Sequence, residues 1–176
     1  MHQCCTGMTH KTTGFTLIEL VVVITILAIL STVAASKFIN IQSSARSSTL
    51  NGIAGGMRST IGMTRAKALA KGLTVAATNP GGVGQQAYVI NFPFGSAEVD
   101  WRNLCPESIA EIADQLTMLD FIELSGTNLS SQVNNQYTLI GYDIPGFSVP
   151  TNQGCYVIYD SFGNPDCTVS VVTADC

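Results

Sequence analysis

An uninterrupted apolar segment near the start of the chain constrains this sequence more than any other feature. From Phe15 to Ser36 the 22 residues read FTLIELVVVITILAILSTVAAS and include a single charged residue, Glu19. As a helix rising 1.5 Å per residue, the segment would be roughly 33 Å long, enough to cross the hydrocarbon core of a bilayer. A carboxylate at membrane depth costs about 2.5–3.5 kcal/mol on insertion scales. We therefore expect a membrane-spanning helix in which Glu19 is a functional residue.

A short polar stretch of 14 residues, MHQCCTGMTHKTTG, precedes the apolar segment, and Lys11 is its only side chain with a formal positive charge. A secretory signal peptide cut near Ala34–Ser36 would explain the apolar run but would leave Glu19 without a role. Both histidines of the chain, His2 and His10, lie in this stretch. If it is removed, histidine triads, cysteine–histidine dyads and histidine metal sites are excluded together. We therefore expect no enzyme, no catalytic residue and no cofactor or metal.

The junction between the two stretches, Gly14-Phe15-Thr16-Leu17-Ile18-Glu19, resembles the processing site of type IV prepilins and type II secretion pseudopilins. The resemblance implies that a prepilin peptidase cuts between Gly14 and Phe15, that Phe15 is N-methylated, and that the apolar helix stays in the mature protein. Cleavage would create a charged amine on Phe15. In low dielectric, that amine and the Glu19 carboxylate of a neighbouring subunit are each costly when unpaired. We therefore expect Phe15 and Glu19 to set the register of assembly.

The residues after the apolar segment resemble one group of type IV pilins more than the others. Lys37-Phe38-Ile39-Asn40-Ile41-Gln42 and Ala45-Arg46 resemble mannose-sensitive haemagglutinin type IV pilins in particular. The resemblance is strong over residues 11–60 and only architectural beyond them. Many relatives place a helix-breaking glycine and proline in the stretch that corresponds to 28–36, where this chain has Ala28 and Ser36. Alanine and serine are far more compatible with a helix than glycine and proline. We therefore do not expect the helix of this chain to have the kink that those relatives have there.

The function that this resemblance implies is structural: a type IV pilus subunit that polymerises through its N-terminal helix for surface attachment, biofilm formation or motility. The implied partners are identical or related pilin subunits in a helical filament, the prepilin peptidase and the inner-membrane assembly ATPase of a Gram-negative cell. The protein would lie in the inner membrane before assembly and in an extracellular filament afterwards. A minor pilin or a secretion pseudopilin is the alternative, and paired C-terminal cysteines favour a pilin. From a different class, a membrane-anchored module could bind a surface glycan through Trp101, Tyr156 and Tyr159.

Helical spacing continues beyond the membrane segment as a single apolar stripe, made of Leu50, Ile53, Ala54, Met57, Ile61, Ala68 and Leu69. Gly72 is a suitable C-cap, so one helix is expected from about Phe15 to Lys71. Glycine is about 1 kcal/mol less favourable than alanine in a helix, and the stem contains Gly52, Gly55, Gly56 and Gly62. We expect a sheet to hold this helix, with the glycines permitting close approach of the two backbones; local flexibility is the alternative.

The rest of the chain reads as a small α+β head. Residues 72–86 are uncharged and rich in glycine, threonine and asparagine, which predicts a surface loop. A helix is expected over Pro106–Leu119, and strands are expected at Ala87–Phe92, Phe121–Leu124, Gln136–Tyr142, Cys155–Tyr159 and Thr168–Thr173. The predicted fold is an antiparallel sheet packed on the long N-terminal helix. The expected divisions are a leader at 1–14, a transmembrane or filament-core helix at 15–36, an amphipathic stem at 37–71 and a globular head at 72–176.

Charge is segregated along the chain, which has a formal net charge of −4. Between Lys37 and Lys71 there are six basic residues and no acid, whereas from Glu98 to the end eleven acids face one base, Arg102. Either the basic stem pairs with its own acidic head, or it pairs with a neighbouring copy; both can hold together. The acidic balance argues against a nucleic-acid partner. Carboxylates at helical spacing, namely Glu107 with Glu111 and Glu111 with Asp114, are expected to form a solvated face.

The six cysteines divide into two groups. Cys4 and Cys5 lie in the leader, and four lie in the part expected to be exported: Cys105, Cys155, Cys167 and Cys176. Export favours two disulfides, and four cysteines allow three connectivities. A hairpin over the last two predicted strands would bring Cys155 near Cys176, which leaves Cys105 for Cys167, but the sequence does not decide between the three. A zinc site is disfavoured because CxxC spacing is absent, and calcium at Asp160, Asn164 and Asp166 remains a weak alternative.

Overall fold

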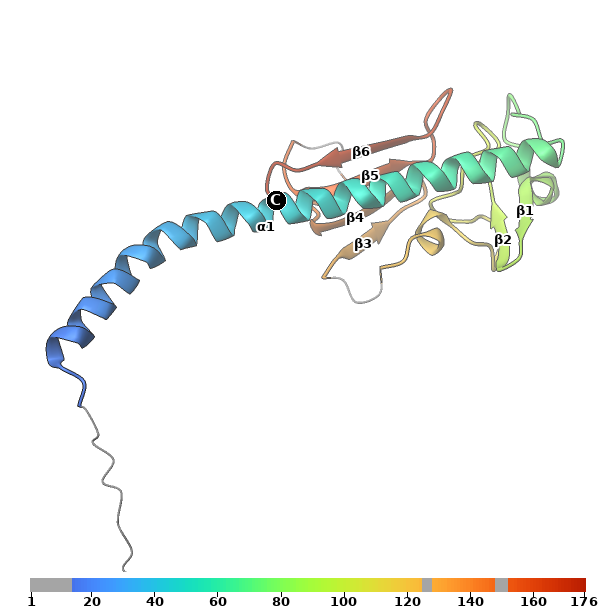
Figure 1. Cartoon of the computed structure of the whole chain (residues 1–176). Helices are drawn as coiled ribbons and strands as arrows, with labels where there is room; N and C mark the ends of the chain where they lie inside the picture. Colours follow the sequence, from blue (N-terminus) through green and yellow to red (C-terminus); the bar gives the residue numbers. More distant parts are fainter. Residues whose placement is uncertain (1–13, 125–127, 148–151) are drawn as a thin grey trace, which may run out of the picture. The chain divides into compact units, whose positions relative to one another are not determined.

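The computed structural model describes residues 14–124, 128–147 and 152–176 (Figure 1). Residues 1–13 of the expected leader (1–14), including both histidines and the two leader cysteines, lie outside the described residues. The chain divides into two compact units, Met1–Ile41 and Gln42–Cys176. Helix α1, Leu17–Ala70, is continuous in sequence through both. The α+β class is confirmed, with a long N-terminal helix followed by antiparallel sheets.

In the second unit, α1 packs against a four-stranded antiparallel sheet whose order follows the chain, β3-β4-β5-β6 (Figure 1). The strands are β3 (Ser130–Val133), β4 (Tyr137–Asp143), β5 (Cys155–Asp160) and β6 (Thr168–Val172). The main core joins the helix to one face of this sheet through fully buried side chains, among them Leu50, Ala54, Met57, Ile140, Val157 and Tyr159. The predicted apolar stripe therefore does face the sheet.

The second part of the head is a hairpin beside the C-terminal end of α1. Its strands are β1 (Val89–Phe92) and β2 (Gly95–Glu98), paired antiparallel, and a separate core cluster packs them against the helix through Ala68, Ile90, Ala97, Val99 and Leu104. Between helix and hairpin lie the short helix α2 (Gly81–Gln85) and the 3-10 turn η1 (Gln86–Tyr88), so the predicted loop over 72–86 is wrong at its end. A second 3-10 turn, η2, spans Met118–Phe121.

The helix stops where the sequence predicts. Gly72 has a φ of +85°, its N–H donates to the Leu69 carbonyl at 2.9 Å, and the Leu73 N–H donates to the Ala68 carbonyl at 3.0 Å. This pair of bonds is a Schellman cap, which favours glycine because the left-handed conformation carries no Cβ penalty there. Leu69, however, is exposed, because the buried stripe runs instead through Thr60, Thr64 and Ala68.

The stem glycines do not touch the sheet, so the expected close approach is wrong. A Cβ added at Gly52, Gly55 or Gly62 would meet open space, and at Gly56 it would make an ordinary 3.5 Å contact with Ile122. These positions lie on the exposed side of α1, a quarter to half a turn from the buried stripe. Burial of the opposite face therefore stabilises the helix despite the glycines.

The helix predicted over Pro106–Leu119 is also wrong. Its backbone groups bind β2 and the chain beside it instead of closing helical bonds: the Leu116 N–H donates to the Ser96 carbonyl at 2.7 Å, and the N–H groups of Glu111 and Ile112 donate to the Glu98 carboxylate at 2.7 and 2.9 Å. The segment folds as irregular chain along β2 because these nonlocal acceptors satisfy its donors.

Four of the five predicted strands are present, as β1, β4, β5 and β6. The strand expected at Phe121–Leu124 is not formed, since Phe121 ends η2 and its ring packs edge-on against Phe92 at 5.4 Å and Phe94 at 5.8 Å. Strands β2 and β3 were not predicted. Their sequences, GSAE and SSQV, have few β-branched or aromatic residues, and they pair because β1 and β4 supply partner edges.

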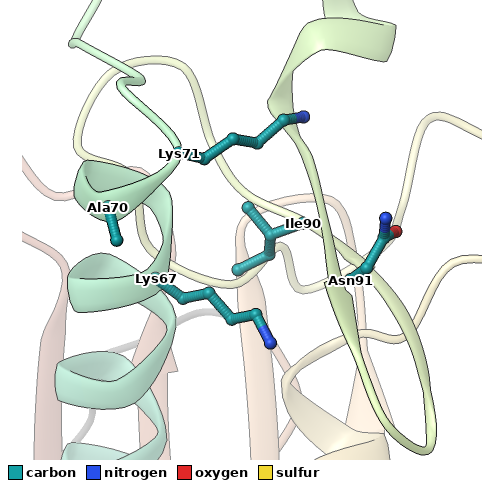
Figure 2. A pocket seen from close by; sticks show the side chains of 5 residues that line it. All are labelled: Lys67, Ala70, Lys71, Ile90 and Asn91. Carbon is teal, nitrogen blue, oxygen red and sulfur yellow. The ribbon is translucent and has the colours of Figure 1, made fainter.

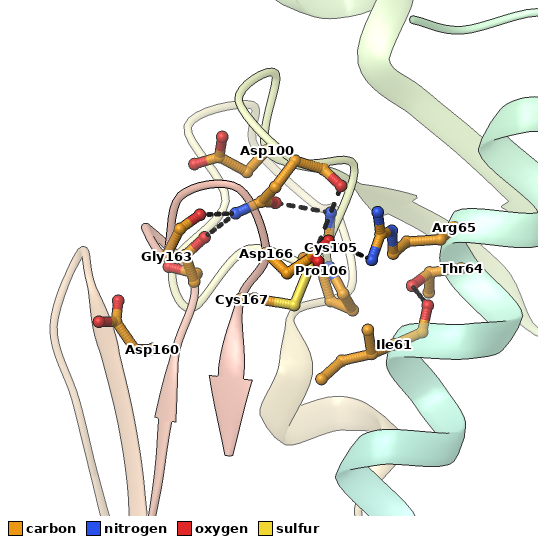
Figure 3. Close-up of a disulfide and its surroundings, with 12 residues drawn as sticks. Ile61, Thr64, Arg65, Asp100, Cys105, Pro106, Asp160, Gly163, Asp166 and Cys167 are labelled. Atoms are coloured by element: carbon orange, nitrogen blue, oxygen red, sulfur yellow. Dashed lines mark hydrogen bonds and ion pairs between the residues drawn. A yellow bond between two sulfur atoms is a disulfide. The ribbon is translucent and has the colours of Figure 1, made fainter. Parts of the chain in front are cut away.

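Two disulfides close the head, Cys105–Cys167 and Cys155–Cys176. This is the pairing that the hairpin of β5 and β6 favours, and it leaves none of the four cysteines for zinc. Beside the first disulfide, the buried Asn103 amide donates to the carbonyls of Ser161 at 2.7 Å and Gly163 at 2.9 Å, while its oxygen accepts the Cys105 N–H (Figure 3). Disulfide and asparagine together tie the segment before Pro106 to the turn between β5 and β6.

Candidate functional site

The candidate site is the N-terminal end of α1 and the apolar helix that follows it. Gly14 is exposed and non-helical, and among the described residues beyond its chain neighbours no atom lies within 4 Å of the place where its Cβ would be. Phe15 is 80% exposed and precedes the first helical residue, Leu17. The part of the chain that the structure describes therefore leaves the bond between Gly14 and Phe15 uncovered.

A capping box fixes the start of the helix. The Glu19 Oε2 atom accepts hydrogen bonds from the Thr16 N–H at 2.9 Å and the Thr16 hydroxyl at 2.7 Å, while the Thr16 Oγ1 atom accepts the Glu19 N–H at 3.3 Å. This reciprocal arrangement satisfies donors that the first turn of a helix otherwise leaves free. The sequence signal is the spacing Thr-x-x-Glu, and Thr16 is a site residue that the sequence reasoning did not single out.

The two carboxylate oxygens of Glu19 differ in the hydrogen bonds that they accept. Both bonds from Thr16 reach Oε2, and no hydrogen bond to Oε1 is formed within the described ranges. A shallow groove of about 360 Å³ lies beside this carboxylate, lined by Phe15, Ile18, Glu19, Val22 and Val23. The arrangement leaves one carboxylate oxygen beside an apolar groove and able to accept a donor from another molecule.

The helix after Glu19 has no polar face. Its large apolar side chains, from Phe15 to Val33, are exposed on every side, and an 18-residue window reaches a mean hydropathy of 2.7 with none of it buried. α1 is the one helix in the described part of the chain that is long and apolar enough to cross a membrane. A helix that is apolar all round requires burial in lipid or among other helices.

The hydroxyl groups in this segment bond within their own helix. Thr25, Ser31 and Thr32 donate to the carbonyls of Val22, Leu27 and Ile29 at 2.7–2.8 Å. Such back-bonding satisfies the hydroxyls where water is absent. Glu19 is therefore the only charged side chain between Phe15 and Ala35, and one of its two carboxylate oxygens accepts no hydrogen bond from the described residues.

In the head, the structure brings together three carboxyl groups that the sequence reasoning did not connect. Glu98, Asp100 and Glu107 are all at least 96% buried, so Glu107 does not belong to the solvated face expected for it, whereas Glu111 and Asp114 are exposed. Glu107 hydrogen-bonds to Asp100, and Asp100 also pairs with the Arg102 guanidinium at 2.7 Å. Burial, reinforced by the neighbouring carboxylates, raises the pKa of Glu107 to about 9.

The stem cations are mostly not paired with the acids of their own head. Within the described residues, Arg65 with Asp166 is the one ion pair between stem and head. Arg58 donates to the Val169 carbonyl at 3.0 Å, and Arg46 lies over the Tyr142 ring. The intrachain interpretation of the charge segregation therefore holds for a single pair, and most of the positive charge on the stem is not neutralised by a carboxylate.

The other candidates from the sequence are not assembled into sites. Tyr156 and Tyr159 are fully buried, so they cannot form a glycan surface with Trp101. Asp160 accepts the Phe162 N–H at 3.0 Å, and Asp166 pairs with Arg65. No group of three or more histidine, cysteine or acidic side chains in the described residues could hold a metal ion.

Comparison with known families matches this N-terminal region. Residues 9–35 fit the family model described as the prokaryotic N-terminal methylation motif. Neither the curated proteins nor the solved structures yield a match. The motif supports a type IV prepilin-like family and a structural pilin or pseudopilin subunit, processed by prepilin peptidase and assembled into pili. The apolar helix fits membrane anchoring followed by incorporation into an extracellular pilus.

Proposed function

We propose that this chain is a structural subunit of a mannose-sensitive-haemagglutinin-like type IV pilus of a Gram-negative bacterium. The observation that carries the proposal is the end of α1, where an exposed Gly14–Phe15 bond precedes a helix that is apolar all round and contains one carboxylate. Such a helix is stable first in lipid and then among the helices of identical or related subunits. The exported filament would serve attachment, biofilm formation or motility.

The proposed organisation follows from this role. Residues 1–14 form the leader that prepilin peptidase removes, and Phe15 becomes the N-methylated first residue. Residues 15–36 form the membrane and filament-core helix, residues 37–71 form the stem, and residues 72–176 form the head. The two disulfides of the head are consistent with its exposure to an oxidising environment after export.

Glu19 sets the register in this proposal. In the single chain, Thr16 satisfies one oxygen of its carboxylate, and the other remains able to accept a hydrogen bond from the Phe15 amine of a neighbouring subunit. In the water-free interior of a filament, an unpaired amine or carboxylate is strongly unfavourable. Only an axial stagger that places the Phe15 amine of one subunit against the Glu19 carboxylate of its neighbour leaves neither charge unpaired.

Substitution of Glu19 by alanine tests this role. We expect Glu19→Ala to insert into the membrane at least as well as the wild type, because it removes a charge from the span. We expect the yield of sheared surface filaments to fall about tenfold or more, since the Phe15 amine then lacks its partner. Ser31→Ala is the matched control, because the Ser31 hydroxyl bonds only to its own helix. Normal filament yield from Glu19→Ala would refute the pairing role.

A further inference from the structure

The head contains two sheets, and in the hairpin of β1 and β2 other parts of the chain bind to both edges. The Lys71 Nζ atom donates to the outer carbonyl of Val89 in β1 at 2.7 Å, and Figure 2 shows this side chain extending from the helix towards β1. On the other side, the Leu116 N–H donates to the outer carbonyl of Ser96 in β2 at 2.7 Å. The hairpin therefore presents few free backbone groups to another molecule.

The four-stranded sheet differs at its first edge strand, β3. The Asn134 N–H donates to the Tyr137 carbonyl at 2.9 Å, at the turn between β3 and β4. Hydrogen-bonded and non-hydrogen-bonded pairs alternate along antiparallel strands, so the N–H and C=O groups of Ser131 and Val133 point away from β4. These backbone groups accept and donate no hydrogen bond within the described residues.

The other edge strand, β6, is also largely uncovered. The same alternation, counted from the bond between the Ser161 N–H and the Gln136 carbonyl at 2.9 Å, directs the backbone groups of Val169 and Val171 away from β5. The Arg58 guanidinium donates to one of them, the Val169 carbonyl, at 3.0 Å. Among the described residues, this is the one hydrogen bond to the outer backbone groups of either edge strand.

Neither edge strand carries the features that usually protect such an edge. The strand β3 reads SSQV and β6 reads TVSVV, so both lack charged residues and proline. Charged side chains and prolines are the common means by which natural proteins prevent edge-to-edge pairing. An edge without them is a template for a strand from another chain.

The two edges are complementary in direction. The sheet has four strands in the order β3-β4-β5-β6, and each neighbouring pair is antiparallel. The strands β3 and β6 therefore run in opposite directions. When two copies of the chain point the same way, as subunits added head to tail do, β6 of one copy is antiparallel to β3 of the other.

The two edges also match in the face on which their side chains lie. Val169 and Val171, whose backbone groups point outward from β6, pack against the main core under the helix. Ser131 lies directly opposite Ile140 of that core, and Val133 is two residues along on the same face. Pairing of the free backbone groups therefore joins the helix-facing side of one sheet to the same side of the next. With an odd number of strands, neither direction nor face would match.

We propose that β6 of one subunit pairs with β3 of a second copy of this chain, which extends the sheet from one head to the next. Val171 pairs with Ser131 of the second copy and Val169 pairs with Val133, through four backbone hydrogen bonds. A carbonyl oxygen has two lone pairs, so Arg58 keeps its bond to Val169. Because two different edges meet, the contact repeats along the assembly and does not close in a dimer. The inference rests on the proposed function, since it requires copies of the same polarity.

Cysteine cross-linking in sheared filaments tests this pairing, with Ser170→Cys and Gln132→Cys in one chain. The proposed register places residue 170 opposite residue 132 of the second copy, in the non-hydrogen-bonded position where Cβ atoms are closest. Within one chain, two strands separate these positions by about 14 Å, too far for a disulfide. We expect a ladder of dimers, trimers and longer oligomers on non-reducing gels, and monomer after reduction.

Two controls use the same cysteine in β6. Ser170→Cys with Ser131→Cys is the matched control, because the side chain of residue 131 lies on the opposite face of the sheet, and it should give no ladder. Ser170→Cys alone should stay monomeric. The proposal is overturned if filaments of the test pair give no ladder, if the matched control cross-links equally well, or if the single variant forms dimers, which would show β6 pairing with β6.

Amide hydrogen exchange in the wild type tests the pairing without any substitution, and it decides the matter if a cysteine variant fails to fold. The outward amides of the two edges should exchange at least about tenfold more slowly in filaments than in the full chain in detergent, namely those of Ser131, Val133, Val169 and Val171. The amide of Asn135, exposed in the turn after β3, should be unchanged. Equal exchange of the edge amides in both states would overturn the proposal.

The outcomes separate this proposal from the assembly role. Wild-type filaments without edge protection would overturn sheet extension alone and leave the pilus subunit intact. Failure of the wild-type chain to form filaments would overturn the proposed function, and sheet extension with it.

Discussion

The buried carboxyl of Glu107 makes the stability of the head depend on pH in a direction opposite to that of an ordinary ion-paired acid. Glu107 is 4% exposed, hydrogen-bonds to Asp100, and has a pKa raised from 4.5 to about 9, chiefly by burial. In the folded head the protonated carboxyl is the donor to the Asp100 carboxylate. Its proton is therefore part of the native structure at neutral pH.

The sign follows from proton binding. Between pH 4.5 and about 9, the folded head holds a proton on Glu107 that the unfolded chain has released. The contribution of Glu107 to the free energy of unfolding should therefore be highest below pH 4.5 and should fall by up to about 1.4 kcal/mol per pH unit as the pH rises towards 9. From pH 6 to pH 8 the wild type should lose up to about 3 kcal/mol from this group.

Glu107→Gln removes this dependence, because an amide can donate to Asp100 without titrating. We expect the variant to lose much less stability than the wild type between pH 6 and pH 8, in denaturant titrations of the full chain in detergent followed by the fluorescence of Trp101. Glu111→Gln, an exposed carboxyl in the same segment, should keep the wild-type slope. Stability curves for the wild type and Glu107→Gln that run parallel from pH 6 to pH 8 would refute the reasoning.

Two further predictions concern the head and the stem. Replacing Cys155 and Cys176 by serine opens a loop with a sequence separation of 21 residues and should cost about 3 kcal/mol in the chain-entropy model, seen as a lower midpoint in denaturant and less pilin surviving in the envelope. Free thiols on folded, exported protein would contradict this. Arg58→Glu should change the stability of the monomer little, since Arg58 forms no ion pair with any of the described residues, but should lower filament yield in a salt-dependent way. Co-expression with Glu111→Lys subunits should restore filaments if the contact joins two chains, and an unchanged yield for Arg58→Glu alone would contradict the contact.

The features predicted from sequence are those encoded by local spacing. The helix from Leu17 to Ala70, its glycine cap at Gly72 and the strands β4, β5 and β6 follow from periodicity and turn chemistry. The hairpin of β5 and β6 then makes the pairing of Cys155 with Cys176 the natural one. At the N-terminal end, residues 9–35 match the N-terminal methylation motif, while the roles of Gly14, Phe15 and Glu19 stay predictions from their spacing.

The features missed depend on partners distant in sequence. Pro106–Leu119 has helical spacing, but the Glu98 carboxylate and the Ser96 carbonyl take its backbone donors. The burial of Glu107 likewise requires the approach of Asp100, which spacing alone does not show. A pocket of about 370 Å³ lies between the C-terminal end of α1 and β1, where Lys67, Lys71 and Ile90 are among its lining residues. Because it forms only when β1 packs on the helix, no local sequence pattern indicates it.

The residue at the N-terminus of protein sheared from the cell surface tests the central claim most directly. Intact mass and terminal sequencing should give a chain that begins at Phe15 and carries one added methyl group on its amine, because the leader ends at Gly14 and the apolar helix is retained. A chain that begins near Lys37 would show an ordinary signal peptide, and an intact Met1 would show no processing. Either result would contradict the account of this chain as a processed, filament-forming subunit.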